Sequence, residues 1–196
     1  MKLSKIALTV IVAGAVATPA LRASAADSGP YLTLDAGANF MQPVTVQSSG
    51  NPSHSTDIDT GWRVGLIGGY NLNSWAAVEL ETGFSDNNIH NSSAWFGTIP
   101  VLGNVVFRYE NQSQFVPYIG VGAGGAEALV QGGGSGDKSD FVFAYQAKLG
   151  VDYKINENMM IDVGYKFFGT ADETFGDTKV KDVYANFIGL SFTWKF

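Results

Sequence analysis

The sequence predicts an all-β protein, an eight-stranded antiparallel up-and-down transmembrane β-barrel that follows a cleaved signal peptide. Three observations predict this fold class. Apolar and polar residues alternate along eight segments, the connections between these segments are alternately short and long, and charges fall on only one of the two faces that the alternation defines. Neighbouring side chains of a strand point to opposite faces of a sheet, so a period of two is typical of strands with one apolar face.

Residues 1–25 have the layout of a signal peptide. Lys2 and Lys5 precede an uncharged apolar run at positions 6–17, and Ala23-Ser24-Ala25 supplies the small residues that signal peptidase requires. We therefore expect a mature domain over residues 26–196. The alternative, an N-terminal membrane anchor, needs roughly 20 apolar residues, and this run is shorter.

The composition of residues 26–196 excludes several classes of protein. All 18 acidic residues but only nine of the 12 basic residues lie there, so the net charge is −9. This charge argues against nucleic acid as a partner and against a basic patch for lipid headgroups. Cysteine is absent, and no cofactor is expected. Because no second apolar stretch reaches 18 residues, only a closed barrel could embed this domain in a membrane.

Each predicted strand is justified by its own alternation, which is clearest at residues 141–153. There one face is entirely apolar, and the other mixes small residues with Gln146, Lys148 and Asp152. Ile67 breaks the pattern of the second segment, and the fourth segment is the least regular. In chain order, the eight strands are predicted at residues 32–40, 62–71, 76–84, 99–109, 115–124, 141–153, 159–167 and 188–196.

The connections provide independent support for this strand assignment. Brief turns are predicted at residues 72–74, 111–113 and 156–158, whereas longer polar loops are predicted at about 41–60, 85–97, 127–140 and 169–182. Short turns at one end and long loops at the other are typical of outer-membrane barrels, whose periplasmic turns are short. We therefore expect a bacterial outer-membrane location with both the N- and C-termini in the periplasm.

The charged residues decide which face meets lipid. A Lys or Arg at mid-bilayer on a barrel exterior costs about 2–4 kcal/mol, so the charged face must point inward. Five acidic and five basic side chains then form a charge-balanced network in the lumen, which is tolerable only if they are paired or hydrated. The predicted network consists of Asp35, Arg63, Glu79, Glu81, Arg108, Lys148, Asp152, Asp162, Lys166 and Lys195.

Aromatic residues gather near the two ends of the predicted outward face, as in the interfacial girdles of membrane barrels. A soluble barrel or sandwich is the alternative, but its interior would need to be apolar, and its charged face would then be the surface. The girdle residues are Phe40, Trp62, Phe84 and Phe141 on the loop side, and Tyr70, Tyr109, Phe115, Tyr153 and Trp194 on the turn side.

Two stretches carry a resemblance to a known family. Residues 116–125 (VPYIGVGAGG) and 192–196 (FTWKF) resemble the small outer-membrane β-barrel family, the porin-family proteins that include the transmembrane domain of OmpA. The resemblance implies that Trp194 and Phe196 act as the assembly signal read by the barrel-assembly machinery. The sequence departs from full-length OmpA in stopping at Phe196, so we expect no peptidoglycan-binding domain. The family is functionally mixed, so it implies no catalytic site.

Several strings resemble functional motifs without their structural context. Residues 120–125 fit G-x-G-x-x-G but continue a strand, and residues 132–139 lack the second glycine of a P-loop. His54 with Asp57 and Asp59 offers metal ligands, although such groups in polar loops are usually solvated. We expect no metal site.

The function predicted from these observations is a non-enzymatic envelope-integrity or surface-contact protein. Its expected partners are outer-membrane lipid and lipopolysaccharide, the latter through divalent cations held by loop acids, and we favour a monomer. Two alternatives stay open. One is a narrow pore for small solutes, and the other is a lipid A-modifying enzyme that uses His90 as base and Ser92 as nucleophile.

Overall fold

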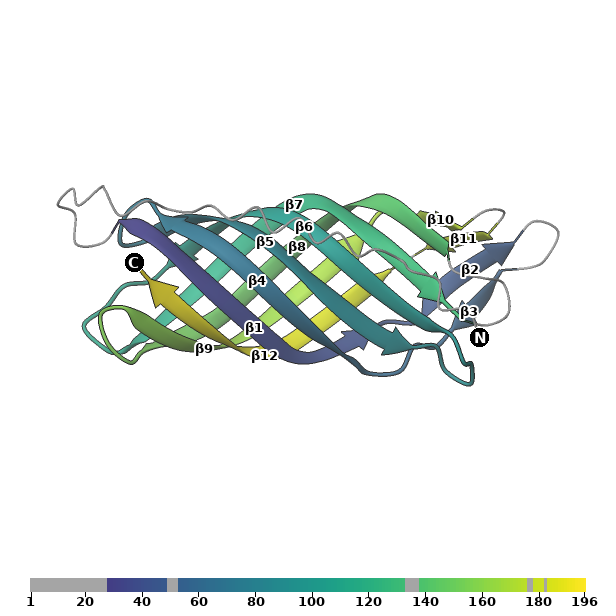
Figure 1. Ribbon diagram of the computed structural model, residues 1–196, viewed down its shortest axis with the longest axis horizontal. Coiled ribbons are helices and arrows are strands. Elements are labelled where there is room, and N and C mark those ends of the chain that lie inside the picture. The colour runs from purple at the N-terminus through teal and green to yellow at the C-terminus, as the bar shows by residue number, and fades with distance from the viewer. Residues whose placement is uncertain (1–27, 49–52, 133–137, 176–177, 182) are drawn as a thin grey trace, which may run out of the picture.

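The computed structural model describes residues 28–48, 53–132, 138–175, 178–181 and 183–196. Eight antiparallel strands close into a barrel, and β1 completes it by pairing with both β12 and β4 (Figure 1). The predicted all-β, eight-stranded antiparallel barrel is confirmed, and the predicted signal peptide lies outside the described residues. The strands are β1 (Gly29–Met41), β4 (Gly61–Asn71), β5 (Ala76–Asn88), β6 (Trp95–Arg108), β7 (Phe115–Gln131), β8 (Lys138–Lys154), β9 (Met159–Thr170) and β12 (Tyr184–Lys195).

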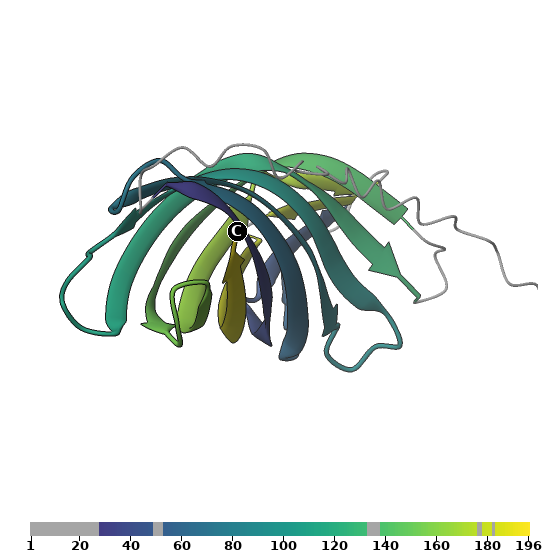
Figure 2. The ribbon, with the colours of Figure 1, turned by 60° about the vertical axis from the view of Figure 1, so that its left-hand side comes forward.

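The three predicted short turns all lie at one end, which we call the turn end, and Figure 2 brings this end forward. An asparagine organises each of them. The side-chain oxygen of Asn73 accepts hydrogen bonds from two backbone amides that follow it, at 3.0 and 2.8 Å. Asn156 likewise accepts from two following amides, and Asn111 accepts from one. Asparagine favours such turns because its side chain can bond its own backbone a few residues later.

The outer surface of the barrel is apolar, as the alternation predicts. Leu80, Val121 and Leu190 are each more than 60% exposed, whereas Ile67, the misfit in the pattern, points inward and is buried. Rings cluster near both ends of this surface, where Phe84 contacts Trp62 at 5.6 Å and Phe115 contacts Tyr153 at 5.1 Å between centroids. Within the described ranges, no helix is long and apolar enough to cross a bilayer.

The opposite end, the loop end, differs from the expectation of long polar loops. Four short strands form a second sheet there, namely β2 (Val44–Ser48), β3 (His54–Thr56), β10 (Glu173–Phe175) and β11 (Thr178–Lys181). Its order, β10-β11-β2-β3, repeats the order β9-β12-β1-β4 of the barrel strands that these segments follow or precede. The barrel wall therefore continues beyond the breaks that separate these short strands from β9, β12, β1 and β4. On the other side of the barrel, β5 to β8 extend without a break into the same region (Figure 1).

Parts of the predicted loops at 41–60, 85–97, 127–140 and 169–182 are thus strand, and the inside of this region explains why. Its side chains form an apolar cluster that we call the loop-end core. The buried members are Val44, Phe96, Ala128, Val180 and Val183, with Met41, Val46, Ile58, Ile89 and Val130 packed against them. Burial of this apolar surface stabilises an ordered wall over a set of mobile loops.

The polarity of the wall inverts between the two regions. On β5 the outward residues change from Leu80 and Phe84 to Asp86 and Asn88. The inward residues change from Glu79 and Glu81, through the buried neutral Ser85 and Asn87, to Ile89 just past the strand. A wall in lipid is apolar outside, and a wall in water is apolar inside. The inversion therefore marks where the barrel leaves the hydrocarbon.

Replacing Phe96 by alanine should loosen the loop-end core selectively. Removing a buried phenylalanine ring costs about 3–5 kcal/mol, and Phe96 is only 3% exposed. We expect faster protease cleavage in the loop-end segments of the folded barrel, with its heat-dependent shift in gel mobility retained. The control is Phe107→Ala, which removes a ring that is 43% exposed on the outer surface. An unchanged cleavage pattern in Phe96→Ala would contradict an ordered loop-end core.

Candidate functional site: a charged network across the lumen

The inward faces of the strands collect the charges that the sequence assigns to the lumen. Strand alternation turns these side chains away from the apolar exterior, and nine of the ten predicted residues are largely buried. Arg108 is the last residue of β6, but its side chain is still only 9% exposed. The tenth residue, Lys195, lies near the turn end and is half-buried.

Four of these residues form a closed ring of alternating charge. Arg63 contacts Asp35 and Glu81, each at 2.7 Å. Lys166 contacts the same two carboxylates, at 2.7 and 2.6 Å. Every member therefore has two opposite charges beside it, which offsets the cost of removing four charges from water. We call this group the central ring.

Glu81 is the hub of the network and is completely buried. Its Oε2 accepts hydrogen bonds from the amide groups of Asn104, at 3.1 Å, and Gln146, at 2.7 Å. Its Oε1 accepts from Lys166, which lies on β9, the strand directly opposite β5 in the circular order of the barrel. The Glu81–Lys166 pair thus crosses the full width of the lumen.

A second cluster lies on the turn-end side of the central ring. Lys148 contacts Glu79, whose other oxygen accepts a hydrogen bond from the Tyr31 hydroxyl at 2.6 Å. Arg108 donates to Tyr31 at 3.2 Å and to Asp152 at 3.3 Å, and its Nη1 donates to Asn71 at 3.1 Å. Tyr118 donates to Asp162.

Lys195 is the one predicted network member that the structure does not bring into contact. Among the described residues, no carboxylate lies within ion-pair distance of its ammonium group; only its backbone is bonded there, to Asn158. Eight of the other nine residues are joined by ion pairs, whereas Asp162 bonds only to the uncharged Tyr118.

Phe187 closes the central ring on the side of the loop end. Its ring centroid lies 5.2 Å from the guanidinium carbon of Arg63 and 5.6 Å from the ammonium nitrogen of Lys166. Cations are attracted to the face of an aromatic ring, and more strongly when water is excluded. Phe187 therefore separates the charged lumen from the loop-end core without leaving either cation against a purely apolar surface.

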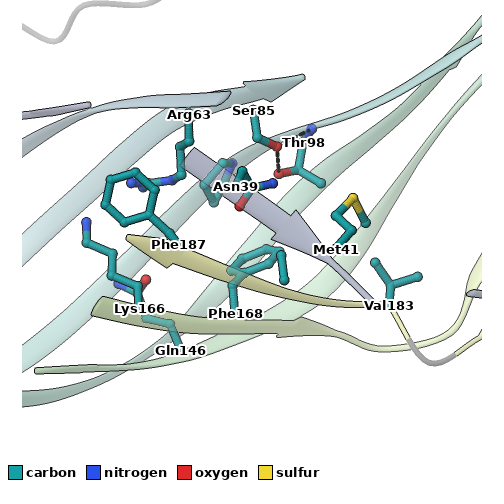
Figure 3. Close-up of a pocket in the computed structure, with 12 residues that line it drawn as sticks. Asn39, Met41, Arg63, Ser85, Thr98, Gln146, Lys166, Phe168, Val183 and Phe187 are labelled. Carbon is teal, nitrogen blue, oxygen red and sulfur yellow. Dashed lines mark hydrogen bonds between the residues drawn. The ribbon is translucent and has the colours of Figure 1, made fainter. Parts of the chain in front are cut away.

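A small cavity remains between the central ring and the loop-end core (Figure 3). It holds about 20 Å³ and is lined by Arg63, Lys166 and Phe187 on the side of the central ring, and by Met41 and Val183 on the side of the loop-end core. Ser85 and Thr98 share a hydrogen bond of 2.8 Å in its wall. A cavity of this size holds about one water molecule, so it is no passage for solutes.

The residues of the enzyme hypothesis lie on the rim of the loop end. His90 Nδ1 is 2.8 Å from Asp59 Oδ1, and both side chains are about half exposed. Asp59 is thus an acid that orients the histidine, which sequence reasoning did not assign. The Ser92 hydroxyl, however, accepts a hydrogen bond from the backbone of Ala94 at 3.1 Å, and no contact joins it to His90 among the described side chains.

The remaining candidate positions can be placed briefly. The His54 side chain and residues 133–137 of the P-loop-like string lie outside the described residues. Within the described part of the chain, no three His, Cys, Asp or Glu side chains come together to hold a metal ion. Trp194 and Phe196 are exposed, at 49% and 75%, and their recognition by the assembly machinery stays a prediction.

Comparison with known proteins assigns the fold to a family. The model of the outer membrane protein β-barrel domain matches residues 7–196, nearly the whole chain. The chain belongs to this family of outer-membrane β-barrels. No curated protein matches this outer-membrane barrel.

Two solved structures show the same fold as this outer-membrane barrel. Neisserial surface protein A (NspA) is 22% identical, with a TM-score of 0.64 over 86% of this chain and 98% of that chain. The outer membrane protein OprG from Pseudomonas aeruginosa is 16% identical, with a TM-score of 0.58 over 86% of this chain and 97% of that chain. At these identities the likeness concerns the fold alone.

Sequence reasoning missed the uncharged members of the network. Tyr31, Asn71, Asn104, Tyr118 and Gln146 all bond to charged side chains. Each lies on a barrel strand with its side chain turned to the lumen, so their position in the alternation was a usable signal. A search for charges alone overlooks them, because neutral donors complete the partners that each buried carboxylate needs.

Breaking the central ring at Arg63 should strongly destabilise the outer-membrane barrel. Removing one partner of a buried ion pair costs about 3–5 kcal/mol, because the other charge is left uncompensated. Arg63→Ala leaves Asp35 and Glu81 each with one cation fewer. We expect this loss of unfolding free energy in urea titrations of the protein in lipid vesicles.

The matched control is Lys154→Ala, which removes the partner of Glu110 in a pair about one-third exposed. Such a pair contributes about 0–1 kcal/mol. Equal effects of Arg63→Ala and Lys154→Ala would show that the central ring contributes no more to stability than a surface pair.

Proposed function

We propose that this outer-membrane barrel is a closed, non-enzymatic protein that serves envelope integrity or surface contact. The observation that carries the proposal is the Glu81–Lys166 pair, which crosses the lumen at 2.6 Å between strands on opposite sides of the barrel. A solute would have to break this pair, together with the contacts of Arg63 and Gln146 to the same carboxylate.

The packing on both sides of the pair supports a closed lumen. The second cluster lies toward the turn end, and Phe187 and the loop-end core lie toward the other end. The cavity between the central ring and that core holds about 20 Å³. Eight strands enclose a lumen that side chains can nearly fill, and here they do so with bonded groups.

The orientation in the membrane follows from the two ends. Outer-membrane barrels place short turns in the periplasm and longer connections outside the cell. We therefore propose that the turn end, with both termini of the barrel domain, faces the periplasm and that the loop end faces the outside. The ordered wall around the loop-end core then presents a rigid surface to lipopolysaccharide or to other cells.

Conductance in a planar bilayer tests the closed lumen. We expect the refolded wild-type protein to be silent, because the central ring and its neighbours leave no continuous water path. The double variant Glu81→Ala/Lys166→Ala removes the pair that crosses the lumen and should conduct in small steps. A double variant of the partly exposed Lys154 and Glu110 pair should stay silent. Stable ion-selective steps from the wild type would refute the proposal in favour of a narrow pore.

Mass spectrometry of lipid A tests the enzyme alternative. The Asp59–His90 pair favours it, but the Ser92 hydroxyl is engaged with Ala94 and not with His90. We expect cells that express the wild type, the His90→Ala variant or no protein to have lipid A of the same mass. A mass shift that requires His90 would establish the lipid-modifying activity instead.

A further inference from the structure

Two pairs of like charges lie directly opposite each other on β8 and β9. Lys148 pairs with Lys166, and Asp152 pairs with Asp162, with Gly150 and Gly164 opposite each other between them. Side chains directly opposite on neighbouring strands have Cβ atoms about 4.5–5.5 Å apart, so like charges there repel. Both pairs point into the lumen and are at least nine-tenths buried.

The lysine pair is fully compensated by carboxylates. Lys148 contacts Glu79 and lies 3.7 Å from Glu81, and Lys166 contacts Asp35 and Glu81. Three carboxylates therefore surround two ammonium groups. Repulsion between the lysines is more than offset by these contacts.

The aspartate pair has no such compensation. Among the side chains that the structure describes, Arg108 is the only cation in contact with it, through Asp152 at 3.3 Å, and Arg108 also lies near Glu79 at 3.8 Å. Asp162 accepts one hydrogen bond, from Tyr118 to its Oδ2. Its Oδ1 is buried and has no hydrogen-bond partner among the described residues. Because Asp162 is only 6% exposed, bulk water does not readily supply that partner.

Tyr118 shapes the space beside this pair. Its hydroxyl lies over the two facing glycines, where a Cβ at Gly150 or Gly164 would come within 2.6 or 2.7 Å of it. The two glycines let the phenol cross from β7 to reach Asp162 on β9. The tyrosine hydroxyl therefore adds a third oxygen-bearing group to the two carboxylates, in contact with Asp162.

We propose that Asp152 and Asp162 bind a hard cation at the turn end of the lumen, with the Tyr118 oxygen beside it. Every candidate ligand is an oxygen atom, which suits Na⁺, Mg²⁺ or Ca²⁺ and not the softer transition metals. The positive charge offsets the repulsion between the carboxylates and provides a partner for the free oxygen of Asp162. It also links β8 to β9 two or three residues from the turn that joins them.

The site lies near water, which can complete the coordination. Asp152 is two residues from the end of β8, and Asp162 is three residues into β9. Because Ca²⁺ sites generally use 6–8 oxygen ligands and this one supplies few from the protein, we expect weak binding, with a Kd of about 10⁻⁴–10⁻³ M. Besides Arg108, the other charged side chains described at this end are Lys195, the exposed Glu157 of the turn between β8 and β9, and the Lys154–Glu110 pair.

Terbium luminescence tests the proposal directly. Tb³⁺ binds to oxygen ligands like Ca²⁺ and emits when a nearby tyrosine is excited. In the refolded protein in detergent, we expect tyrosine-sensitised emission that falls by at least fivefold in Asp162→Asn. It should fall in Tyr118→Phe as well. Asp57→Asn, which changes an exposed acid at the loop end, is the matched control and should keep the emission.

Competition and thermal unfolding then identify the cation. Of CaCl₂, MgCl₂ and NaCl, added at constant ionic strength, the natural ligand should displace Tb³⁺ and raise the unfolding midpoint of the wild type but not of Asp162→Asn. If Asp162→Asn does not fold, Asp152→Asn serves the same purpose. Emission that is equal in wild type and variant, or an unfolding midpoint that no cation raises, would overturn the proposal.

Discussion

The structure depends on the high cost of placing an ionised side chain against hydrocarbon. On the lipid side of a barrel there is neither water nor a protein partner, so each charge on a membrane strand must turn to the lumen. The lumen of eight strands is too narrow to hold so many charges as independently hydrated ions. They must therefore solvate one another, and the central ring of Asp35, Arg63, Glu81 and Lys166 is the result.

The same constraint explains the change of polarity along the wall. Beyond the hydrocarbon, at the loop end, water contacts the outer face of the wall. Apolar side chains are then shielded from water only on the inner face. The loop-end core around Phe96 and Val183 fills that place. Phe187 sits where the two interiors meet, because an aromatic ring can face cations on one side and aliphatic groups on the other.

Much of this architecture could be predicted from the sequence. Alternation located all eight barrel strands, the short turns and the inward direction of the charges, since these depend on a period of two and on the cost of charge in lipid. The short loop-end strands and the loop-end part of β6 escaped because their apolar residues, such as Val44 on β2 and Phe96 on β6, lie on the inner face. A search for strands with an apolar outer face therefore interprets these segments as irregular polar loops.

The contacts within the network could not be predicted in the same way. Which carboxylate contacts which cation depends on the stagger between neighbouring strands and on the position of each strand around the closed barrel. Lys166 reaches Asp35, on a strand that is not its direct neighbour, and Glu81, on the opposite side. Lys195 shares the inward direction of the other charges but lies beyond their reach, which alternation alone cannot reveal.

The long sequence distances across the network bear on how this barrel folds. Asp35 and Lys166 are separated by 131 positions, and Thr33 and Thr193, which join the first and last strands, by 160. Contacts between such distant residues carry a high entropy cost of loop closure, and this cost slows folding. An open sheet in the membrane would also expose unpaired charges, so partly closed intermediates are disfavoured. Closure and charge pairing must then occur together, which makes insertion a cooperative event.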